Sequence, residues 1–274
     1  MAARIIDFPS SDANEQEQLE GLGDGVIVDV LAKLRDTEIW REMLLPLDCK
    51  LDAAADALIT LFGWGGYHIW QFESAQGVIF DDPNVPADDF PTPEDEQHVP
   101  AMAATLEDVL PEENSTATFV YDFGDYWEIE LTRVTDLPAD MYIYPIMPLC
   151  VDGQMMAPLE DVGGVGGWEG FLEVMKDPQN SDYEMFREWA GIKEDDVFMP
   201  EYFLPRDVNA VFAEQMLDGM QEELPDDVDT LKDMVVELFS DNLALQTETM
   251  LMAADMFSSL QDIDGFDFDD LPGF

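Results

Sequence analysis

A large excess of carboxylates is the feature that most limits what this chain can fold into. Sixty-two Asp and Glu residues stand against eleven Lys and Arg, giving a formal net charge of −51 at pH 7. Because an unpaired carboxylate is costly to bury, most of these side chains must lie at the surface. Such a surface repels nucleic-acid backbones, which proteins bind through Lys and Arg. The same surface attracts basic proteins and divalent cations.

The chain nevertheless has enough apolar residues to build a core. Hydrophobic residues occupy 47% of its 274 positions, which is typical of a folded globular protein and not of an acidic disordered one. No apolar run approaches the roughly 18 residues that a membrane helix needs, or the length of a signal peptide. Two cysteines, Cys49 and Cys150, are too few for a disulfide scaffold or a four-cysteine zinc site. We expect a cytoplasmic protein with no membrane segment.

Hydrophobic periodicity predicts both strands and helices. Apolar side chains recur at steps of three and four within residues 51–64, which predicts a helix that ends at Gly63. Strands are predicted at residues 26–34, 38–45, 68–74, 78–80, 118–121 and 127–134. Further helices are predicted at residues 102–110, 168–175, 181–190, with Ser181 as the cap, and 207–220. The proline-rich, acidic residues 81–100 are predicted to form an exposed loop, and a proline-rich turn is expected after the last strand.

Composition divides the chain into three parts. Residues 1–24 are polar and predict a flexible leader, and residues 25–215 contain the predicted strands and most of the helices. Residues 216–274 are predicted as an acidic helical extension and tail. The fold class expected is α+β, with a mixed or antiparallel sheet packed with helices, plus the acidic α-helical C-terminal extension.

Four blocks of sequence carry a resemblance to a known family. In chain order they are IWREMLLPLDCKLDAAADALITLFGWGGYHIWQFE, YDFGDYWEIELTRV, PLEDVGGVGGWEGFLEVMKDP and YFLPRDVNAVF. Together they resemble the plasmid pRiA4b ORF-3-like family over about residues 26–215. Members of that family occur on plasmids, in transposon-associated reading frames and in bacterial and archaeal chromosomes. The resemblance implies an α+β fold and no established activity.

This chain departs from the family pattern at two places. The family usually has a histidine after the Trp-Glu pair, whereas Glu128 is followed here by Ile129. The usual Cys-Pro-Pro-Glu-Asp-Cys-Gly-Gly corresponds here to the segment MAPLEDVGG at residues 156–164, which has no cysteine. If those Cys and His groups hold a metal or do chemistry in the family, this member has lost them.

Carboxylates near the second and third blocks are the candidate metal ligands. Calcium and magnesium prefer oxygen ligands, and the candidates are Asp122, Asp125, Glu160 and Asp161. The alternative is structural, because aspartates beside glycine also cap turns by accepting backbone N–H bonds. The glycine run GGVGG that follows predicts a tight turn and not a phosphate cradle, since the acidic pair before it would repel phosphate.

Aromatic residues and one histidine are the candidates for a binding groove. They are Trp40, Arg41, Trp64, His68 and Trp127. The alternative is that the tryptophans fill the core and that His68 is half-buried and bonded to a backbone carbonyl. No serine-hydrolase, zinc-protease or P-loop motif accompanies them, so no catalytic residue is predicted.

The C-terminal tail alternates acidic with apolar residues. Its apolar members are Phe266, Phe268, Leu271 and Phe274. Segments of this kind bind basic grooves, with the charges steering and the aromatic rings anchoring. The alternative is a solvated, disordered end.

These observations leave three hypotheses for function. The leading one is a non-enzymatic, acidic interaction protein of a family associated with plasmids and mobile elements; it binds a basic protein partner, in one version by imitating the charge of DNA. The second is a metal-binding protein or hydrolase that uses the carboxylates and His68 with a divalent cation. The third is a domain whose surface is adapted to high salt. No other cofactor, no direct nucleic-acid binding and no particular oligomeric state is predicted.

Overall fold

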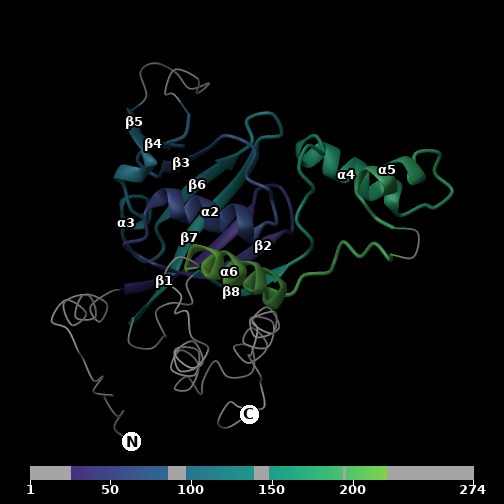
Figure 1. The fold of residues 1–274 in the computed structure, drawn as a ribbon. Coiled ribbons are helices and arrows are strands. Elements are labelled where there is room, and N and C mark those ends of the chain that lie inside the picture. The colour runs from purple at the N-terminus through teal and green to yellow at the C-terminus, as the bar shows by residue number, and fades with distance from the viewer. Residues whose placement is uncertain (1–25, 86–96, 139–147, 194–195, 221–274) are drawn as a thin grey trace, which may run out of the picture.

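The computed structural model describes residues 26–85, 97–138, 148–193 and 196–220. Their centre is one eight-stranded sheet with the strand order β5-β4-β3-β6-β7-β1-β2-β8. Neighbouring strands are antiparallel except β4 and β5, which run parallel. Helices pack with this sheet, so the predicted α+β class is confirmed (Figure 1). The predicted leader and the extension beyond residue 220 lie outside the described residues.

The elements have the following bounds. The strands are β1 Val26–Leu34, β2 Trp40–Pro46, β3 Trp70–Ser74, β4 Val78–Asp81, β5 Gln97–Pro100, β6 Thr116–Tyr121, β7 Trp127–Pro138 and β8 Leu149–Gln154. The helices are α2 Leu51–Leu61, the 3-10 turn η2 Ala101–Ala103, α3 Leu106–Val109, α4 Gly164–Met175, α5 Tyr183–Trp189 and α6 Pro205–Met220.

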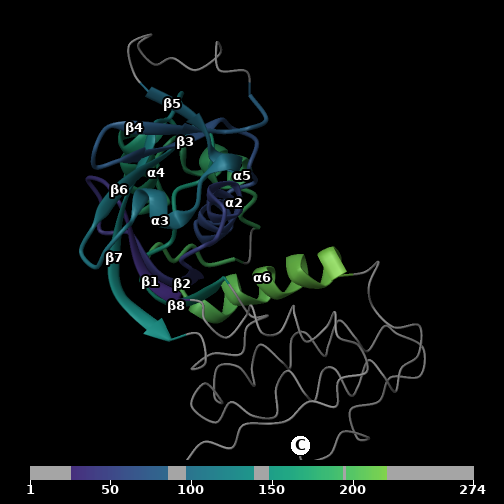
Figure 2. The same cartoon turned by 90° about the vertical axis from the view of Figure 1, so that its left-hand side faces the viewer.

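The core lies between the sheet and α2. Successive strand residues point to opposite faces, and β1 turns Val28, Val30, Ala32 and Leu34 to the buried face. The apolar stripe of α2 packs into the same cluster. Figure 2 shows α2 and α6 on one side of the sheet, and Figure 1 shows α4 and α5 projecting away from it. No helix in the described ranges is both long and apolar enough to cross a membrane.

Two sheet edges differ from the sequence-based expectation. The prediction of a loop over residues 81–100 is wrong at both ends of that range. Asp81 is the last residue of β4, and residues 97–100 form β5 beside it. A ring nitrogen of His98 lies 2.8 Å from the Asp81 carboxylate, which allows this acid to be buried. At the other edge, β8 replaces part of the predicted turn. Asn209 of α6 bonds both the N–H and the C=O of Cys150, a distant contact that local sequence does not reveal.

Three helix predictions need correction. The predicted 102–110 helix is broken at Ala104, whose carbonyl accepts the N–H of Leu51 while its backbone is extended. Helix α4 begins at Gly164, four residues before the predicted start at Trp168, and the tight turn predicted for the glycine run is limited to Gly163 and Gly164, which have positive φ. Ser181 is not a helix cap: Asp182 holds the position before α5, and the Ser181 hydroxyl bonds the Asp182 carboxylate instead.

Candidate functional site

Three loops meet at the end of the sheet where β6 stops. They are the segment after α2 at residues 63–69, the β6–β7 turn at 122–126 and the segment before α4 at 158–163. Trp64 joins them: its indole N–H donates to the Pro158 carbonyl at 3.0 Å. Its ring also stacks on Tyr121 and Trp127, with centroid distances of 4.9 Å and 6.0 Å. Trp64 and Trp127 are both buried in the core cluster, and Trp64 also lines the pocket beside His68.

Glu160 ties the first and third loops to the sheet. Tyr121 donates its hydroxyl to Glu160 Oε1 at 2.5 Å, and the N–H of Gly65 donates to Glu160 Oε2 at 2.8 Å. Burial, followed by the hydrogen bond and charge of Glu160, raises the pKa of Tyr121 above its ordinary value. The phenol therefore keeps the proton that it donates to Glu160, which preserves this link between the loop and the sheet.

Asp125 has a similar structural role. Its carboxylate accepts the N–H of Gly163 at 3.0 Å, just before α4 begins. Two of the four carboxylates predicted as metal ligands, Glu160 and Asp125, thus accept backbone N–H bonds that connect loops. This is the structural role that the sequence left open as an alternative.

The other two predicted ligands, Asp122 and Asp161, converge on His68, although Asp122 Oδ1 also caps its own turn by accepting the N–H of Gly124 at 2.8 Å. The ring nitrogens of His68 lie 3.6 Å from Asp122 Oδ1 and 3.4 Å from Asp161 Oδ1. One ligand atom from each of the three residues lies within 4.8 Å of the other two. Asp122 is buried, His68 is half-buried and Asp161 is exposed, so the group opens to solvent on one side. An imidazole with two carboxylates is a donor set that suits zinc or manganese better than calcium.

Arg41 and Trp40 are not part of the His68 group. Arg41 is buried and donates to the carbonyls of Trp40, Gln154 and Met155 at 2.7–2.9 Å. Its guanidinium lies 3.7 Å from the centre of the Phe203 ring, and burial lowers its pKa to about 10. Trp40 is the neighbouring residue in β2, so its side chain faces the opposite side of the sheet. Arg41 therefore holds β2 to β8, and it reaches the Trp64 cluster only through Phe62, whose ring centre lies 5.4 Å from the guanidinium and 5.1 Å from the Trp64 ring.

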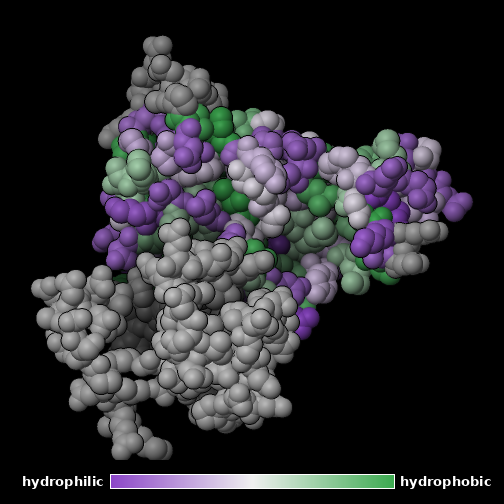
Figure 3. All heavy atoms as spheres, in the orientation of Figure 1, coloured by the Kyte–Doolittle hydropathy of each residue, from purple (hydrophilic) through white to green (hydrophobic). Residues whose placement is uncertain are grey.

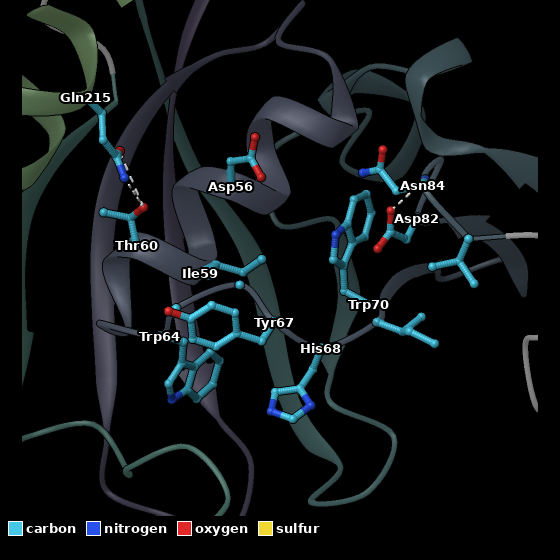
Figure 4. Close-up of a pocket in the computed structure, with 14 residues that line it drawn as sticks. Asp56, Ile59, Thr60, Trp64, Tyr67, His68, Trp70, Asp82, Asn84 and Gln215 are labelled. Carbon is cyan, nitrogen blue, oxygen red and sulfur yellow. Dashed lines mark hydrogen bonds between the residues drawn. The ribbon is translucent and has the colours of Figure 1, made fainter. Parts of the chain in front are cut away.

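A pocket of about 640 Å³ opens beside His68 (Figure 4). Its acidic members are Asp56 from α2 and Asp82 from the segment after β4, and the rings of Tyr67 and Trp70 also line it. Sequence reasoning missed these four residues. Asp56 had a weak signal, because it lies off the apolar stripe of α2, but nothing local connects it to Asp82.

The predicted tail anchors are not part of the site as described. Phe266, Phe268, Leu271 and Phe274 lie outside the described residues. Their predicted binding role stays a prediction.

The fold and the loops match a known protein family. A family model described as plasmid pRiA4b ORF-3-like protein matches residues 26–207, which is more than half of the chain. The chain belongs to this family. The matched region runs from the first residue of β1 into α6 and contains the three loops that meet at His68.

Two relatives support the same assignment. The chain is 27% identical over 153 residues to "Uncharacterized protein y4hQ" of Sinorhizobium fredii (strain NBRC 101917 / NGR234), covering 56% of this chain and 74% of the relative. It is also similar to the crystal structure of a protein of unknown function, MM3350, from Methanosarcina mazei Go1. That similarity has a TM-score of 0.55 and 27% identity, and covers 67% of this chain and 97% of the other. Neither name states an activity.

The loop that carries Asp161 depends on Gly167. A Cβ atom at Gly167 would lie 1.9 Å from the Val162 carbonyl oxygen, whereas a Cβ at Gly166 meets nothing within 4 Å. We expect Gly167→Ala to destabilise the protein by about 1–3 kcal/mol through overpacking. Gly166→Ala, in the same helix, should stabilise it by up to about 1 kcal/mol. Urea unfolding of both variants checks this, and equal effects would show that the contact is not tight.

Proposed function

We propose that this member of the family is a non-enzymatic binding protein whose acidic surface engages a basic protein partner. The observation that supports the proposal is where the cations lie. Arg41 and Arg133 are buried and donate to main-chain carbonyls or to a carboxylate. Other cations are already paired with acids in the same chain: Arg35 with Glu128, Lys176 with Glu173 and Arg206 with Asp207.

Internal pairing of the cations leaves many carboxylates near one another without a positive neighbour. Burial, followed by the hydrogen bond and charge of Glu42, raises the pKa of Asp29 to about 7. Burial and the charges of Asp52 and Asp82 likewise raise the pKa of Asp56. In both places burial, followed by like charge, opposes full ionisation, so a cation supplied from outside would be bound favourably.

Hydrophilic residues lie over much of the described surface (Figure 3), and acids far outnumber bases among the charged residues of the chain. Figure 3 shows hydrophilic residues over both the body of the sheet and the α4–α5 projection on the face that it presents. Spread charge steers an oppositely charged partner from a distance, and this attraction weakens as salt rises. Proteins that bind nucleic acid present the complementary basic surface. The acidic surface would then occupy such a partner by imitating the charge of DNA.

The basic-partner proposal predicts salt-sensitive capture. The immobilised chain should retain proteins of high isoelectric point at low salt, release them at about 0.5 M salt, and release them to added duplex DNA, because ions and DNA compete for the same attraction. An unrelated protein of equal net charge serves as the matched control. Retention equal to that control, or retention indifferent to salt, would contradict the proposal.

A divalent-cation site at His68, Asp122 and Asp161 is a second candidate function. Its specific support is that two carboxylates and an imidazole from three separate segments lie within 4.8 Å of one another. Asp161 is exposed, which leaves room for water or a substrate on a bound ion. Such an ion could serve binding or hydrolysis.

Calorimetry with calcium, magnesium, manganese and zinc tests the metal proposal. We expect one zinc or manganese ion per chain, and Asp161→Asn should weaken its binding by at least about tenfold. Asp48→Asn removes an equal charge from an exposed position that is not part of the group, and should leave this binding unchanged. The proposal fails if none of the four ions binds stoichiometrically, or if both variants bind alike.

A further inference from the structure

The pocket beside α2 concentrates negative charge without a matching cation. It is lined by fourteen residues, among which Asp56 and Asp82 are acidic and none is Lys or Arg. Its volume of about 640 Å³ falls in the range of small-ligand sites, which is roughly 300–1,000 Å³. The pocket is therefore large enough for a long side chain together with part of the backbone that carries it.

Asp82 is the buried acid of this pocket. Its side chain is 7% exposed, and Oδ1 accepts the N–H of Asn84 at 2.9 Å. The other oxygen, Oδ2, has no hydrogen-bond donor within the described part of the chain. A donor or a cation that enters the pocket can therefore bind Oδ2, and the low dielectric around a mostly buried carboxylate strengthens such a contact. Asp56 adds a second negative charge, and burial, followed by the charges of Asp52 and Asp82, raises its pKa.

Two aromatic rings border the same space. Tyr67 is 86% exposed, and Figure 4 shows Tyr67 and Trp70 on either side of the pocket. The Tyr67 ring lies against Gly65, where an added Cβ would be 2.3 Å from Tyr67 Cε2. Trp70 is 5% exposed, and its indole N–H has no acceptor within the residues that the structure describes. A ligand therefore meets carboxylates, aromatic faces and one open N–H donor.

We infer that this pocket receives an arginine side chain of the basic partner, an inference that rests on the proposed function. A planar guanidinium stacks on aromatic rings and forms paired hydrogen bonds with carboxylates, which a lysine ammonium does less well. Asp56 and Asp82 hold the guanidinium, and Tyr67 covers it at the rim. The apolar stem of the arginine packs against Ile59, and its backbone carbonyl accepts the open N–H of Trp70.

A titration with a matched pair of small probes tests the pocket directly. N-acetyl-arginine amide is added to the full chain, and N-acetyl-citrulline amide, which has nearly the same shape but no charge, is the control. The NMR signal of the Trp70 indole N–H, assigned with Trp70→Phe, is the readout. The arginine probe should shift this signal saturably while the citrulline probe does not. No shift, or equal shifts, would overturn the inference.

Variants test whether the pocket matters to a larger ligand. Asp56→Asn removes one charge from the rim, and Glu73→Gln removes one charge from the opposite face of β3. Gly65→Ala keeps the charge but displaces the Tyr67 ring. Asp56→Asn and Gly65→Ala should each weaken binding of an arginine-rich peptide by about fivefold or more, and Glu73→Gln by less than about twofold.

The outcomes distinguish failure of the pocket inference from failure of the basic-partner proposal on which it rests. If Asp56→Asn and Glu73→Gln weaken the peptide equally while basic proteins are still captured, the pocket inference is overturned and the basic-partner proposal stands. If the arginine probe shifts Trp70 but no salt-sensitive protein is captured, the basic-partner proposal fails and the pocket is supported as a guanidinium site.

Discussion

The small number of cations relative to acids is the constraint on which the rest of the structure depends. Two arginines that are buried in the described part of the chain, Arg41 and Arg133, show its effect. Arg41 donates to three main-chain carbonyls, and Arg133 donates to Asp136 and to the Leu110 carbonyl, so both are used to hold the fold together. With only eleven cations for sixty-two acids, each cation used inside leaves more carboxylates unmatched outside. A chain of this kind has little positive charge to offer a phosphate backbone, but it offers negative charge to any basic surface.

Hydrogen bonds within the chain then limit which carboxylates can bind an added cation. Glu160 is occupied by Tyr121 and Gly65, and Asp125 by Gly163, so these acids fix the loops. Two neighbouring places gather further acids: the group beside His68, where Asp122 Oδ1 also accepts the N–H of Gly124, and the pocket that includes Asp56 and Asp82. His68 contributes to both, because it also lines the pocket. A metal ion and a guanidinium are therefore the two cations that we propose for adjacent parts of one site.

The sequence predicted what depends on local periodicity and missed what depends on distant partners. β1 and α2 followed from alternation and from a three-to-four spacing of apolar residues. β8 did not, because Asn209 and β2 hold it in place from elsewhere in the chain. For the site, the sequence predicted Asp122 and Asp161 as ligands. Their proximity to His68 depends on the tertiary structure, because the three residues come from separate segments. The pocket was missed because its acids and rings come from separate segments.

Thermal unfolding at matched ionic strength tests the central claim. The claim is that cations of a partner bind, at defined places, carboxylates that have no cation of the same chain beside them. The chain is melted with an arginine-rich peptide, and again with potassium chloride at the same ionic strength. At about a hundredfold excess over its Kd, the peptide should add about 2.7 kcal/mol of stability beyond the salt, because a ligand of the folded state shifts the unfolding equilibrium. Equal melting temperatures in the two solutions would contradict the account, since simple screening would then explain every effect of positive charge.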